Sequence, residues 1–455
     1  AIAASGICLV AVPVNMGAQN WDDHDRSGRY ATVAHAKNYL NSCAPNAILF
    51  TYGDNDTFPL WYVQEVEGFR RDVRVVNLSL LGGAWYIDQI QRKAYETPGV
   101  PASFPKELYH EGKIDFVAVE ERIDKAYPLK EVMDFVASDD PATKSTRYQG
   151  NISYIPTRKV YLPVDKEKVI ANGTVSPEDS SLIVDRVDIE INKSSLNISE
   201  LMVLDILATN NWERPVYFGI GMGQDSYMGF EKYFQLEGAA YRVVPIKTEE
   251  NEMYFDYGRV NTEILYDNLM NKFEWGNIKD PKVNIDHFHD NTIAIMKYRN
   301  TFLRLAEQIM AEAELPTQPG DSVVLLDTAK VNKAVNVLDK CLEELPLYQV
   351  PADNFLLNYI SIYYTAGQFE KGNDLAWALA IDNAQTLRYI ASLSPARRKA
   401  LERDEYNSTR VLQMLMTTAM QSGQEDFAQE IRSMAENTIT GRPVTSDREN
   451  KNFAK

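Results

Sequence analysis

Hydrophobic and polar positions in the first half of the chain follow the periods of strands and helices in turn. The run "NAILFTYGD" (residues 46–54) is apolar and ends in Gly and Asp, and "RDVRVVNLSLLGG" (71–83) is a second such run. Each is followed by apolar residues at helical spacing, in "TFPLWYVQEVEG" and in "AWYIDQIQRKAYE". Strand, helix, strand and helix in this order predict βαβ units and a mostly parallel sheet.

The middle of the chain carries a different pattern. "NISYIPTRKVYLPVDKEKV" and "DRVDIEI" alternate between apolar and polar residues, which predicts an inserted, antiparallel β-rich segment. "SELMVLDILATNN" then has the period of a helix, with Asn197 and Ser199 as start signals. "RPVYFGIG" and "AAYRVVPI" follow as strands, which we expect to rejoin the parallel sheet. We therefore predict an α/β domain over residues 20–290.

The last third is predicted to be helical over residues 291–440. In "NTIAIMKYRNTFLRLAEQIMAEAEL", Ile295, Phe302 and Ile309 are seven residues apart, as in a long amphipathic helix. The Pro- and Gly-rich "LPTQPGDS" forms a joint, and further helices follow it. The tail, residues 441–455, is predicted to be disordered.

This helical part resembles tetratricopeptide-like helix pairs. The small residues Ala334, Gly372 and Ala428 occupy the positions at which such pairs approach each other closely. They are separated by 38 and 56 residues, whereas the regular repeat is about 34 residues long. We therefore expect an irregular, tetratricopeptide-like domain.

Composition and charge exclude some classes of function. The chain has 455 residues, 45% of them hydrophobic, so we expect more than one folded domain rather than wholesale disorder. Its net charge of −17 argues against a nucleic-acid partner, because phosphate backbones bind clustered Lys and Arg. Cys8, Cys43 and Cys341 have neither a disulfide pattern nor metal-ligand spacing.

The first residues, "AIAASGICLVAVPV", carry no charge over fourteen positions. A membrane span needs roughly twenty apolar residues, so this stretch is too short to cross a bilayer alone. Three interpretations remain open for residues 1–19: a buried strand or helix, the remnant of a signal sequence, or the end or flank of a membrane helix.

The polar stretch after the first predicted strand is a candidate site. Asp54, Asn55, Asp56 and Thr57 occupy the carboxyl end of that strand, which is where open α/β sheets bind ligands. Asp54 and Asp56 could hold Mg²⁺, Mn²⁺ or Ca²⁺ through carboxylate oxygens. The alternative is structural, because Asp56 or Thr57 directly before a helix is an ordinary N-cap.

A second candidate is the charged stretch "NWDDHDRSGRY". It could be an exposed loop without function, or a hydrogen-bonded network that forms part of a site; no nucleophile accompanies it. The candidate residues are Trp21, Asp22, Asp23, His24, Asp25 and Arg26.

Two weaker candidates follow. In "IDHFHDN", His287 and His289 could bind zinc, but they stand at a helix start, where i and i+2 do not share a face. In "NNWERPVYF", Trp212 and Arg214 either belong to a buried polar turn with a structural role or form a wall of the Asp54–Thr57 cleft. The chain lacks a completed glycine-rich phosphate loop, a Gly-x-Ser-x-Gly elbow and a His-Glu-x-x-His motif.

"NWDDHDRSGRY", "NSCAPNAILFTYGDNDTFPLWYVQEVEGFRRDVRVVNLSLL" and "NNWERPVYF" together resemble one family. This is the soluble C-terminal region of large bacterial multi-pass membrane proteins related to protein O-mannosyltransferases, in the C superfamily of glycosyltransferases. The resemblance covers nearly the whole chain. It implies that the first residues end a membrane helix and that this region lies on the periplasmic side of the inner membrane. It also implies a polyprenyl-linked sugar donor and a catalytic acid in membrane loops that this chain does not contain, so no catalytic residue is carried over.

We therefore expect a periplasmic region that helps to bind or position an acceptor polypeptide or glycan, in partnership with its own membrane domain. Two alternatives remain open. One is an independent soluble transferase or hydrolase that acts on sugars with a divalent metal on Asp54 and Asp56. The other is a pure protein-interaction module in which both acidic stretches are structural.

Overall fold

The structure is a computed structural model that describes residues 2–110, 116–147, 152–248, 257–286, 296–315 and 325–442. The chain divides into two compact units. One is an α/β unit over residues 32–274, and the other is a helical unit that combines residues 275–455 with residues 1–31. Mixed sheets in the first half and helices in the second confirm the predicted order of the two fold classes.

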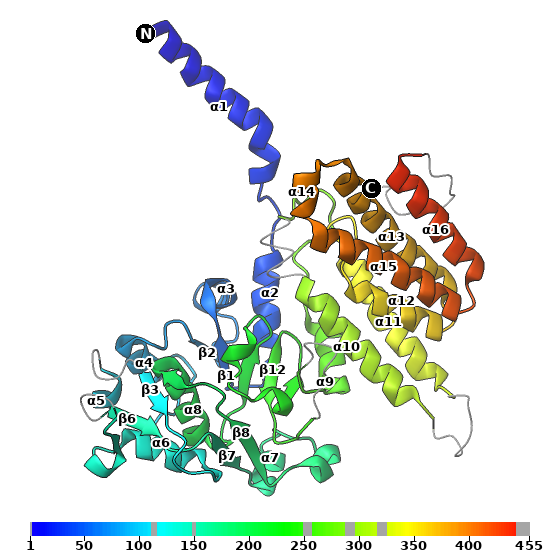
Figure 1. Cartoon of the computed structure of the whole chain (residues 1–455). Helices are drawn as coiled ribbons and strands as arrows, with labels where there is room; N and C mark the ends of the chain where they lie inside the picture. The colour runs from blue at the N-terminus through cyan, green and yellow to red at the C-terminus, as the bar shows by residue number, and fades with distance from the viewer. Residues whose placement is uncertain are drawn as a thin grey trace. The chain divides into compact units, whose positions relative to one another are not determined.

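The α/β unit contains three sheets and the helices that connect their strands (Figure 1). Its helices are α2 (Ala31–Asn41), α3 (Gly53–Glu65), α4 (Ala84–Ile90), α5 (Lys106–Tyr109), α6 (Leu129–Ala137), α7 (Lys166–Ala171), α8 (Ile198–Asn210) and α9 (Thr262–Asp267). The strands of the largest sheet are β1 (Ile48–Thr51), β2 (Arg74–Asn77), β10 (Val216–Gly219), β11 (Phe234–Leu236), β12 (Ala240–Val243) and β13 (Arg259–Val260). The two smaller sheets contain β3 (Phe116–Val119), β4 (Tyr127–Pro128), β5 (Lys144–Ser145), β6 (Ile152–Ile155), β7 (Lys159–Pro163), β8 (Arg186–Glu190) and β9 (Ser195–Asn197).

The largest sheet has the strand order β13-β11-β12-β10-β1-β2. β1 pairs in parallel with both β2 and β10, which confirms the predicted βαβ unit. β11 and β13 also pair in parallel, so three of the five strand pairs of this sheet are parallel. The expectation that the strand in "AAYRVVPI" rejoins the parallel sheet is wrong, because β12 is antiparallel to both β10 and β11. β11 and β12 are separated by a short turn that includes Gly238, and strands joined by such a turn must run in opposite directions. The predicted β-rich insertion is confirmed, since β7 and β8 pair antiparallel with alternating burial.

The helix that returns the chain to the large sheet begins where the sequence predicted. Asn197 is the N-cap of α8, and its side chain accepts the backbone N–H of Glu200 at 3.0 Å. The Glu200 carboxylate accepts the Asn197 N–H in return at 2.8 Å, which completes a capping box. Most of α8 is buried, including Asp205, which accepts hydrogen bonds from the backbone N–H groups of Ser103 and Phe104. Apolar residues are not confined to one face of α8, because the helix is buried on nearly all sides.

A half-buried arginine, Arg70, closes the carboxyl end of α2. Arg70 donates hydrogen bonds to the carbonyl oxygens of Leu40 at 2.8 Å and of Cys43 at 3.1 Å. The same guanidinium contacts Asp72, with 2.8 Å between Nε and Oδ1. Asp72 also accepts the backbone N–H of Asn46 at 3.1 Å. These contacts join the end of α2, the start of β1 and the turn before β2, so they set the register in which the two strands begin.

Asp72 should make the stability of the α/β unit depend on acid. Burial alone would raise the pKa of Asp72, but the hydrogen bonds and charge of Arg70, with the Asn46 N–H, lower the pKa below its ordinary value. A carboxyl group with a lowered folded-state pKa adds stability above its unfolded pKa of about 3.9, and that stability is lost as the pH falls through the folded-state pKa. We expect Asp72→Asn to destabilise the protein at neutral pH and to approach the wild type below about pH 3 in urea unfolding. An equal difference at both pH values would contradict this assignment.

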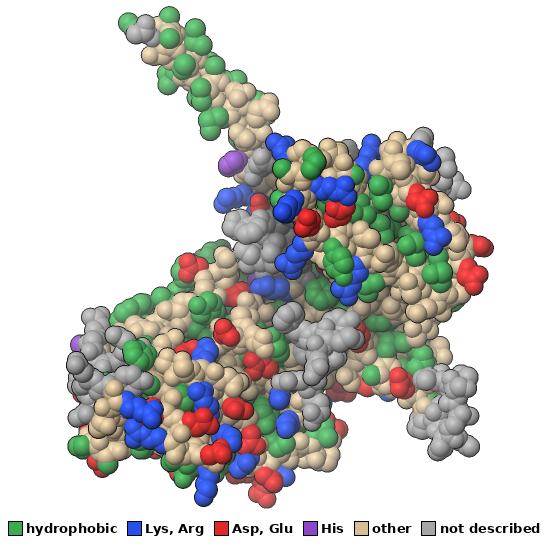
Figure 2. All heavy atoms as spheres, in the orientation of Figure 1, with side chains coloured by type: hydrophobic (Ala, Val, Ile, Leu, Met, Phe, Trp, Pro, Cys, Tyr) green, Lys and Arg blue, Asp and Glu red, His purple; other side chains and the backbone are tan. Residues whose placement is uncertain are grey.

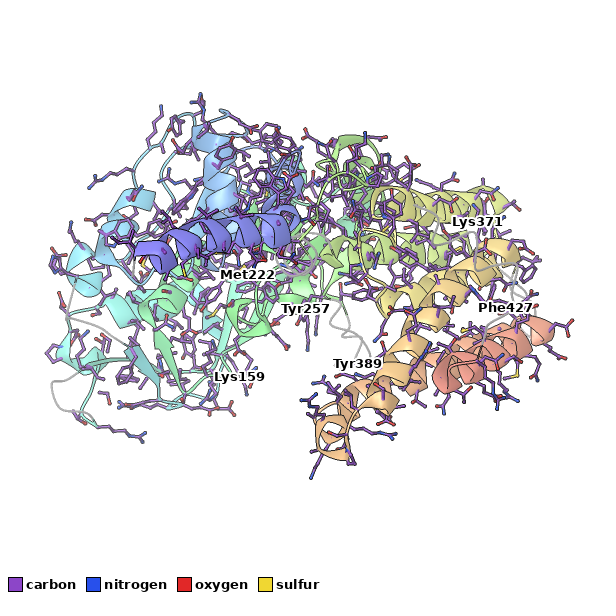
Figure 3. All side chains as sticks on the ribbon, turned by 90° about the horizontal axis from the view of Figure 1, so that it is seen from above. Lys159, Met222, Tyr257, Lys371, Tyr389 and Phe427 are labelled. Atoms are coloured by element: carbon purple, nitrogen blue, oxygen red, sulfur yellow. The ribbon has the colours of Figure 1, made fainter. Side chains whose placement is uncertain are left out.

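The helical unit contains α10 (Met296–Ala313), α11 (Thr328–Glu344), α12 (Phe355–Thr365), α13 (Phe369–Ser392), α14 (Pro395–Lys399), α15 (Glu402–Gln421) and α16 (Glu425–Thr440), together with α1 (Ile2–His24). Phe302 and Ile309 are buried on α10, as the seven-residue spacing predicted. Trp377 of α13 is almost fully buried, with its ring 6.4 Å from that of Phe427 on α16; Figure 3 labels Phe427.

Two helical hairpins in this unit end their first helix in the same way. Gly367 follows α12 and Gly423 follows α15, both with positive φ, at 70° and 71°. The Gln368 N–H bonds the Tyr363 carbonyl, and the Gln424 N–H bonds the Ala419 carbonyl, each at 2.8 Å. These are Schellman motifs, which stop a helix and turn the chain back. Gly372 of α13 lies so close to α12 that an added Cβ would stand 2.4 Å from a ring carbon of Tyr364.

A fully buried arginine fixes the loop between α11 and α12. Arg299 of α10 is fully buried and contacts Asp353, with 2.9 Å between Nη1 and Oδ2. Its guanidinium also donates to the carbonyl oxygens of Pro351 and Val350, the latter at 2.8 Å. One side chain therefore holds several carbonyl groups of a segment that has no secondary structure of its own.

One helix in the described chain is long and apolar enough to cross a membrane. This segment of α1, Ile2–Trp21, has 20 residues and a mean hydropathy of 1.5, and none of it is buried. The helix is longer than the uncharged fourteen-residue stretch, because the polar residues Asn15 and Asn20 continue it instead of ending it. The described residues do not bury this helix, and Figure 2 shows hydrophobic side chains exposed along α1.

The three cysteines are free, as their spacing predicted. Cys8 on α1 is exposed, Cys43 is buried in the α/β unit, and Cys341 is buried in the helical unit. Burial raises the pKa of both buried thiols, and that of Cys341 reaches about 12.

Candidate functional site

The Asp54–Thr57 stretch lies at the point where the order of the large sheet changes direction. The chain leaves β1 through α3 to reach β2 on one side, and later returns through α8 to β10 on the other side of β1. Both neighbours are parallel to β1, so the carboxyl ends of all three strands lie at one edge of the sheet. Ligands of open α/β sheets bind at such a switch point. We call the residues Gly53, Asp56, Thr57, Asn77 and Gly219 the carboxyl edge.

Thr57 is at the centre of a buried hydrogen-bond network at the carboxyl edge. Its hydroxyl donates to the Gly53 carbonyl at 2.7 Å and accepts from the Asn77 amide at 2.8 Å. The Thr51 hydroxyl, 2.8 Å away, occupies the remaining acceptor position. With one donor and two acceptor positions used, the Thr57 hydroxyl joins β1, β2 and α3 and has no capacity left for a ligand.

The capping interpretation of Asp56 and Thr57 is wrong. α3 begins at Gly53, which has a φ of 76°, so Asp56 and Thr57 lie inside its first turn. The N-cap is Tyr52, whose side chain makes no capping hydrogen bond. Glycine adopts positive φ at little cost, and it lets the helix begin soon after the strand, with its N-cap four residues before Asp56.

The two aspartates have different surroundings. Asp54 and its neighbour Asn55 are exposed, whereas Asp56 is 4% exposed and lies within electrostatic range of Tyr227. Burial, neighbouring tyrosines and the charge of Asp56 together raise the pKa of Tyr227, whose hydroxyl donates to the Gly219 carbonyl at 3.1 Å. In the described parts of the chain, no group of three or more His, Cys, Asp or Glu side chains is placed to hold a metal ion.

α3 presents aromatic side chains to solvent. Phe58, Tyr62 and Val66, which lie at helical spacing in the sequence, are each between 47 and 69% exposed. The buried residues of α3 are instead Leu60, Val63 and three polar residues, Asp56, Thr57 and Gln64.

The polar residues are turned inward because they are hydrogen-bonded there. The Gln64 amide donates to the carbonyl oxygens of Arg70 and Val73, each at 2.9 Å. On the exposed side of α3, the polar residues Asp54 and Asn55 lie near the exposed aromatic side chains of Tyr52 and Phe58.

Trp212 and Arg214 do not belong to the carboxyl edge. They precede β10, so they lie at the opposite, amino-terminal edge of the parallel strands. Trp212 is buried and donates its indole N–H to the Pro163 carbonyl at 2.8 Å. Arg214 donates to the Asn46 carbonyl at 2.8 Å and to the Gly99 carbonyl at 3.2 Å. The interpretation of these residues as a wall of the Asp54–Thr57 cleft is therefore wrong, because parallel strands separate the two ends.

The charged stretch near the N-terminus belongs to the helical unit. Trp21 and His24 lie in the last turns of α1 rather than in a loop, and Trp21 is 76% exposed. Asp25 accepts the backbone N–H of Ser27 at 2.8 Å, and hydrogen bonds with Ser27 lower the pKa of Asp25. Arg26 is exposed, and its carbonyl accepts the Arg29 N–H. Asp22 and Asp23 are part of the helix, and the surroundings of their side chains are not described.

The proposed zinc residues His287 and His289 lie outside the described residues. Sequence reasoning also missed two members of the site region, Asn77 and Tyr227. Asn77 ends an apolar strand with a polar side chain, as Thr51 does, and that signal was available. Tyr227 has no local signal, since only the pairing of β10 with β1 brings it near Asp56.

Together these features define an α/β domain whose largest sheet carries a polar, partly buried edge at its switch point. Residues 32–264 match the family described as TMEM260-associated domain 2. The match covers just over half of the 455 residues, and the chain belongs to this family. No curated protein and no solved structure matches the chain.

Proposed function

We propose that this chain is the extracytoplasmic region of a membrane-embedded glycosyltransferase and that it helps to bind and position the acceptor polypeptide. The observation that carries this proposal is the order of two features. An exposed 20-residue apolar helix, Ile2–Trp21, is followed by a domain of the TMEM260-associated family at residues 32–264. The chemistry of sugar transfer belongs to the membrane part of such an enzyme, so we assign no catalytic residue here.

The exposed part of α3 supports a role in acceptor binding. Asp54 and Asn55 offer hydrogen-bonding groups, and Tyr52 and Phe58, about half exposed, offer rigid aromatic surface beside them. Polypeptide-binding surfaces are enriched in aromatic residues, which bury large areas at a small cost in side-chain entropy. The buried Thr57–Asn77 network below keeps the first turn of α3 in place.

The helical unit would hold the acceptor or a partner protein. We propose that its hairpins form an irregular tetratricopeptide-like array, supported by the matching Schellman turns at Gly367 and Gly423. A hydrogen bond between Asn373 and Gln424, at 3.3 Å, joins the two hairpins. Stacked helix pairs of this kind commonly form extended binding surfaces.

The test uses the full-length enzyme with Asp54→Ala/Asn55→Ala. We expect the KM for the acceptor polypeptide to rise several-fold with kcat unchanged, because only acceptor binding loses interactions. The matched control is Glu178→Ala/Ser180→Ala, which also removes one exposed carboxylate and one exposed neutral group from the α/β unit. Unchanged kinetics in the Asp54/Asn55 variant, or a fall in kcat alone, would overturn the proposed binding role.

A further inference from the structure

A pocket of about 610 Å³ lies on the outer side of β2, between α3 and α4. β2 is the last strand of the large sheet, so its second edge faces this pocket rather than another strand. Trp61 of α3 and Tyr95, in the turn after α4, are among the residues that line it. A pocket of this size is within the range of small-molecule sites.

The charge of this pocket is opposite to that of the chain. Arg71, Arg74, Arg92 and Lys93 line it, together with a single carboxylate among the described residues, Glu65. The chain as a whole has a net charge of −17. A group of cations in an acidic protein focuses a positive potential and draws anions toward one place.

Arg74, Arg92 and Lys93 form no ion pair among the described residues, although Glu65 acts on Arg74 and Asp88 on Arg92 at longer range. Arg92 and Lys93 are exposed. Arg74 is half-buried and donates one hydrogen bond, to the Gln89 carbonyl at 2.9 Å. Burial lowers the pKa of Arg74, opposed by Tyr86 and Glu65, which means that its charge is partly desolvated. A bound anion would supply the interaction that water no longer provides.

Tyr95 is held in an unfavourable backbone conformation at the pocket wall. Its φ is 52°, a region that non-glycine residues rarely adopt. The Tyr95 hydroxyl donates a hydrogen bond to Glu65, the carboxylate that lines the pocket. The Arg71 guanidinium lies 4.6 Å from the centre of the Tyr95 ring. Arg71 is itself paired with Glu96 at 3.4 Å. Strained residues fixed by several neighbours are concentrated at binding sites.

We propose that this pocket binds an organic phosphate, with the phosphate held by Arg74, Arg92 and Lys93 and the attached sugar or base placed against Trp61. Guanidinium groups match the geometry of phosphate oxygens. The pocket is larger than an inorganic phosphate needs, so the ligand carries a second, ring-shaped part. This inference goes beyond the proposed function and does not rest on it.

The experiment is isothermal titration calorimetry of the full chain with inorganic phosphate, AMP and glucose 1-phosphate, with adenosine and glucose as uncharged partners. We expect saturable binding of AMP or glucose 1-phosphate, weaker binding of inorganic phosphate, and none of the uncharged pair. Affinity should fall as NaCl is raised, because exposed charges are screened. Saturable binding of adenosine as tight as that of AMP, or no binding of any phosphate, would overturn the proposal.

Variants locate the site. Arg92→Ala/Lys93→Ala should raise the Kd at least about tenfold, since two of the phosphate-binding charges are lost. Lys125→Ala, an exposed cation elsewhere in the α/β unit, should leave the Kd unchanged. Arg92 and Lys93 follow α4, so an alternative role is to stabilise the carboxyl end of that helix. In that case the double variant would melt at a lower temperature with an unchanged Kd, which would overturn the assignment.

The same chemistry could come from a lipid, so a second arm compares phosphatidylcholine vesicles with and without phosphatidic acid. Added binding to phosphatidic acid that the Arg92/Lys93 variant loses would assign the phosphate to a lipid headgroup. Binding that is equal for both vesicles, with saturable AMP or glucose 1-phosphate binding, would assign it to a soluble ligand.

Discussion

Replacing Arg299 with alanine is expected to lower the free energy of unfolding of the helical unit by about 3–5 kcal/mol. Arg299 is fully buried, and its guanidinium bonds Asp353 and the carbonyl oxygens of Pro351 and Val350. Burial raises the pKa of Asp353 even though the Arg299 charge opposes this, so desolvation offsets much of the ion pair. The expected loss therefore comes mainly from buried acceptors left without donors and from the cavity.

Hydrogen exchange in urea, read on peptides from α10 to α12, measures this loss in the unit concerned. Arg299→Met keeps most of the volume but none of the donors, so it should recover the cavity part only. Arg397→Ala removes an exposed arginine from α14 and should change stability by less than about 0.5 kcal/mol. If Arg299→Ala were as mild as Arg397→Ala, the loop would be held by other contacts.

Gly258→Ala is expected to cost about 2–5 kcal/mol in the α/β unit. Gly258 comes directly before β13 and has a φ of 65°. An added Cβ would stand 1.9 Å from the carbonyl oxygen of Phe234, at the start of β11. Backbone atoms cannot turn away as a flexible side chain can, so β13 would have to separate from β11.

Gly173→Ala is the matched control, because it distinguishes the two causes. Gly173 has a similar φ of 71°, but no atom lies within 4 Å of the position of an added Cβ. It should therefore lose only the conformational part, about 1–2 kcal/mol. Urea unfolding midpoints of both variants give the comparison. Equal losses would show that β11 and β13 can absorb the extra methyl group.

Local signals predicted the elements of this fold better than their directions. The start of α8 could be predicted because Asn197 and Glu200 cap the helix without help from distant residues. The direction of β12 could not, because it depends on pairing with β11 and β10. The apolar spacing of "TFPLWYVQEVEG" predicted a helix but did not reveal its buried face, since Gln64 points inward only because the Arg70 and Val73 carbonyl groups accept its hydrogen bonds.

In the candidate site too, the sequence predicted local positions but not the contacts between distant residues. The sequence placed Asp54 to Thr57 at the carboxyl end of a strand, and the structure confirms that position. It could not separate exposed Asp54 from buried Asp56, because that depends on where Tyr227 lies. Trp212 and Arg214 were grouped with them by composition, although the parallel direction of β10 puts them at the other end.

The positions of the three thiols have a practical consequence. Alkylation requires a thiolate that reagent can reach, so Cys8 reacts in the native protein, whereas Cys43 and Cys341 react only when the structure around them opens. Cys43 belongs to the α/β unit and Cys341 to the helical unit. Each unit thus contains one buried thiol that serves as a probe of local unfolding. The alkylation rates of Cys43 and Cys341 report separately how often each unit opens.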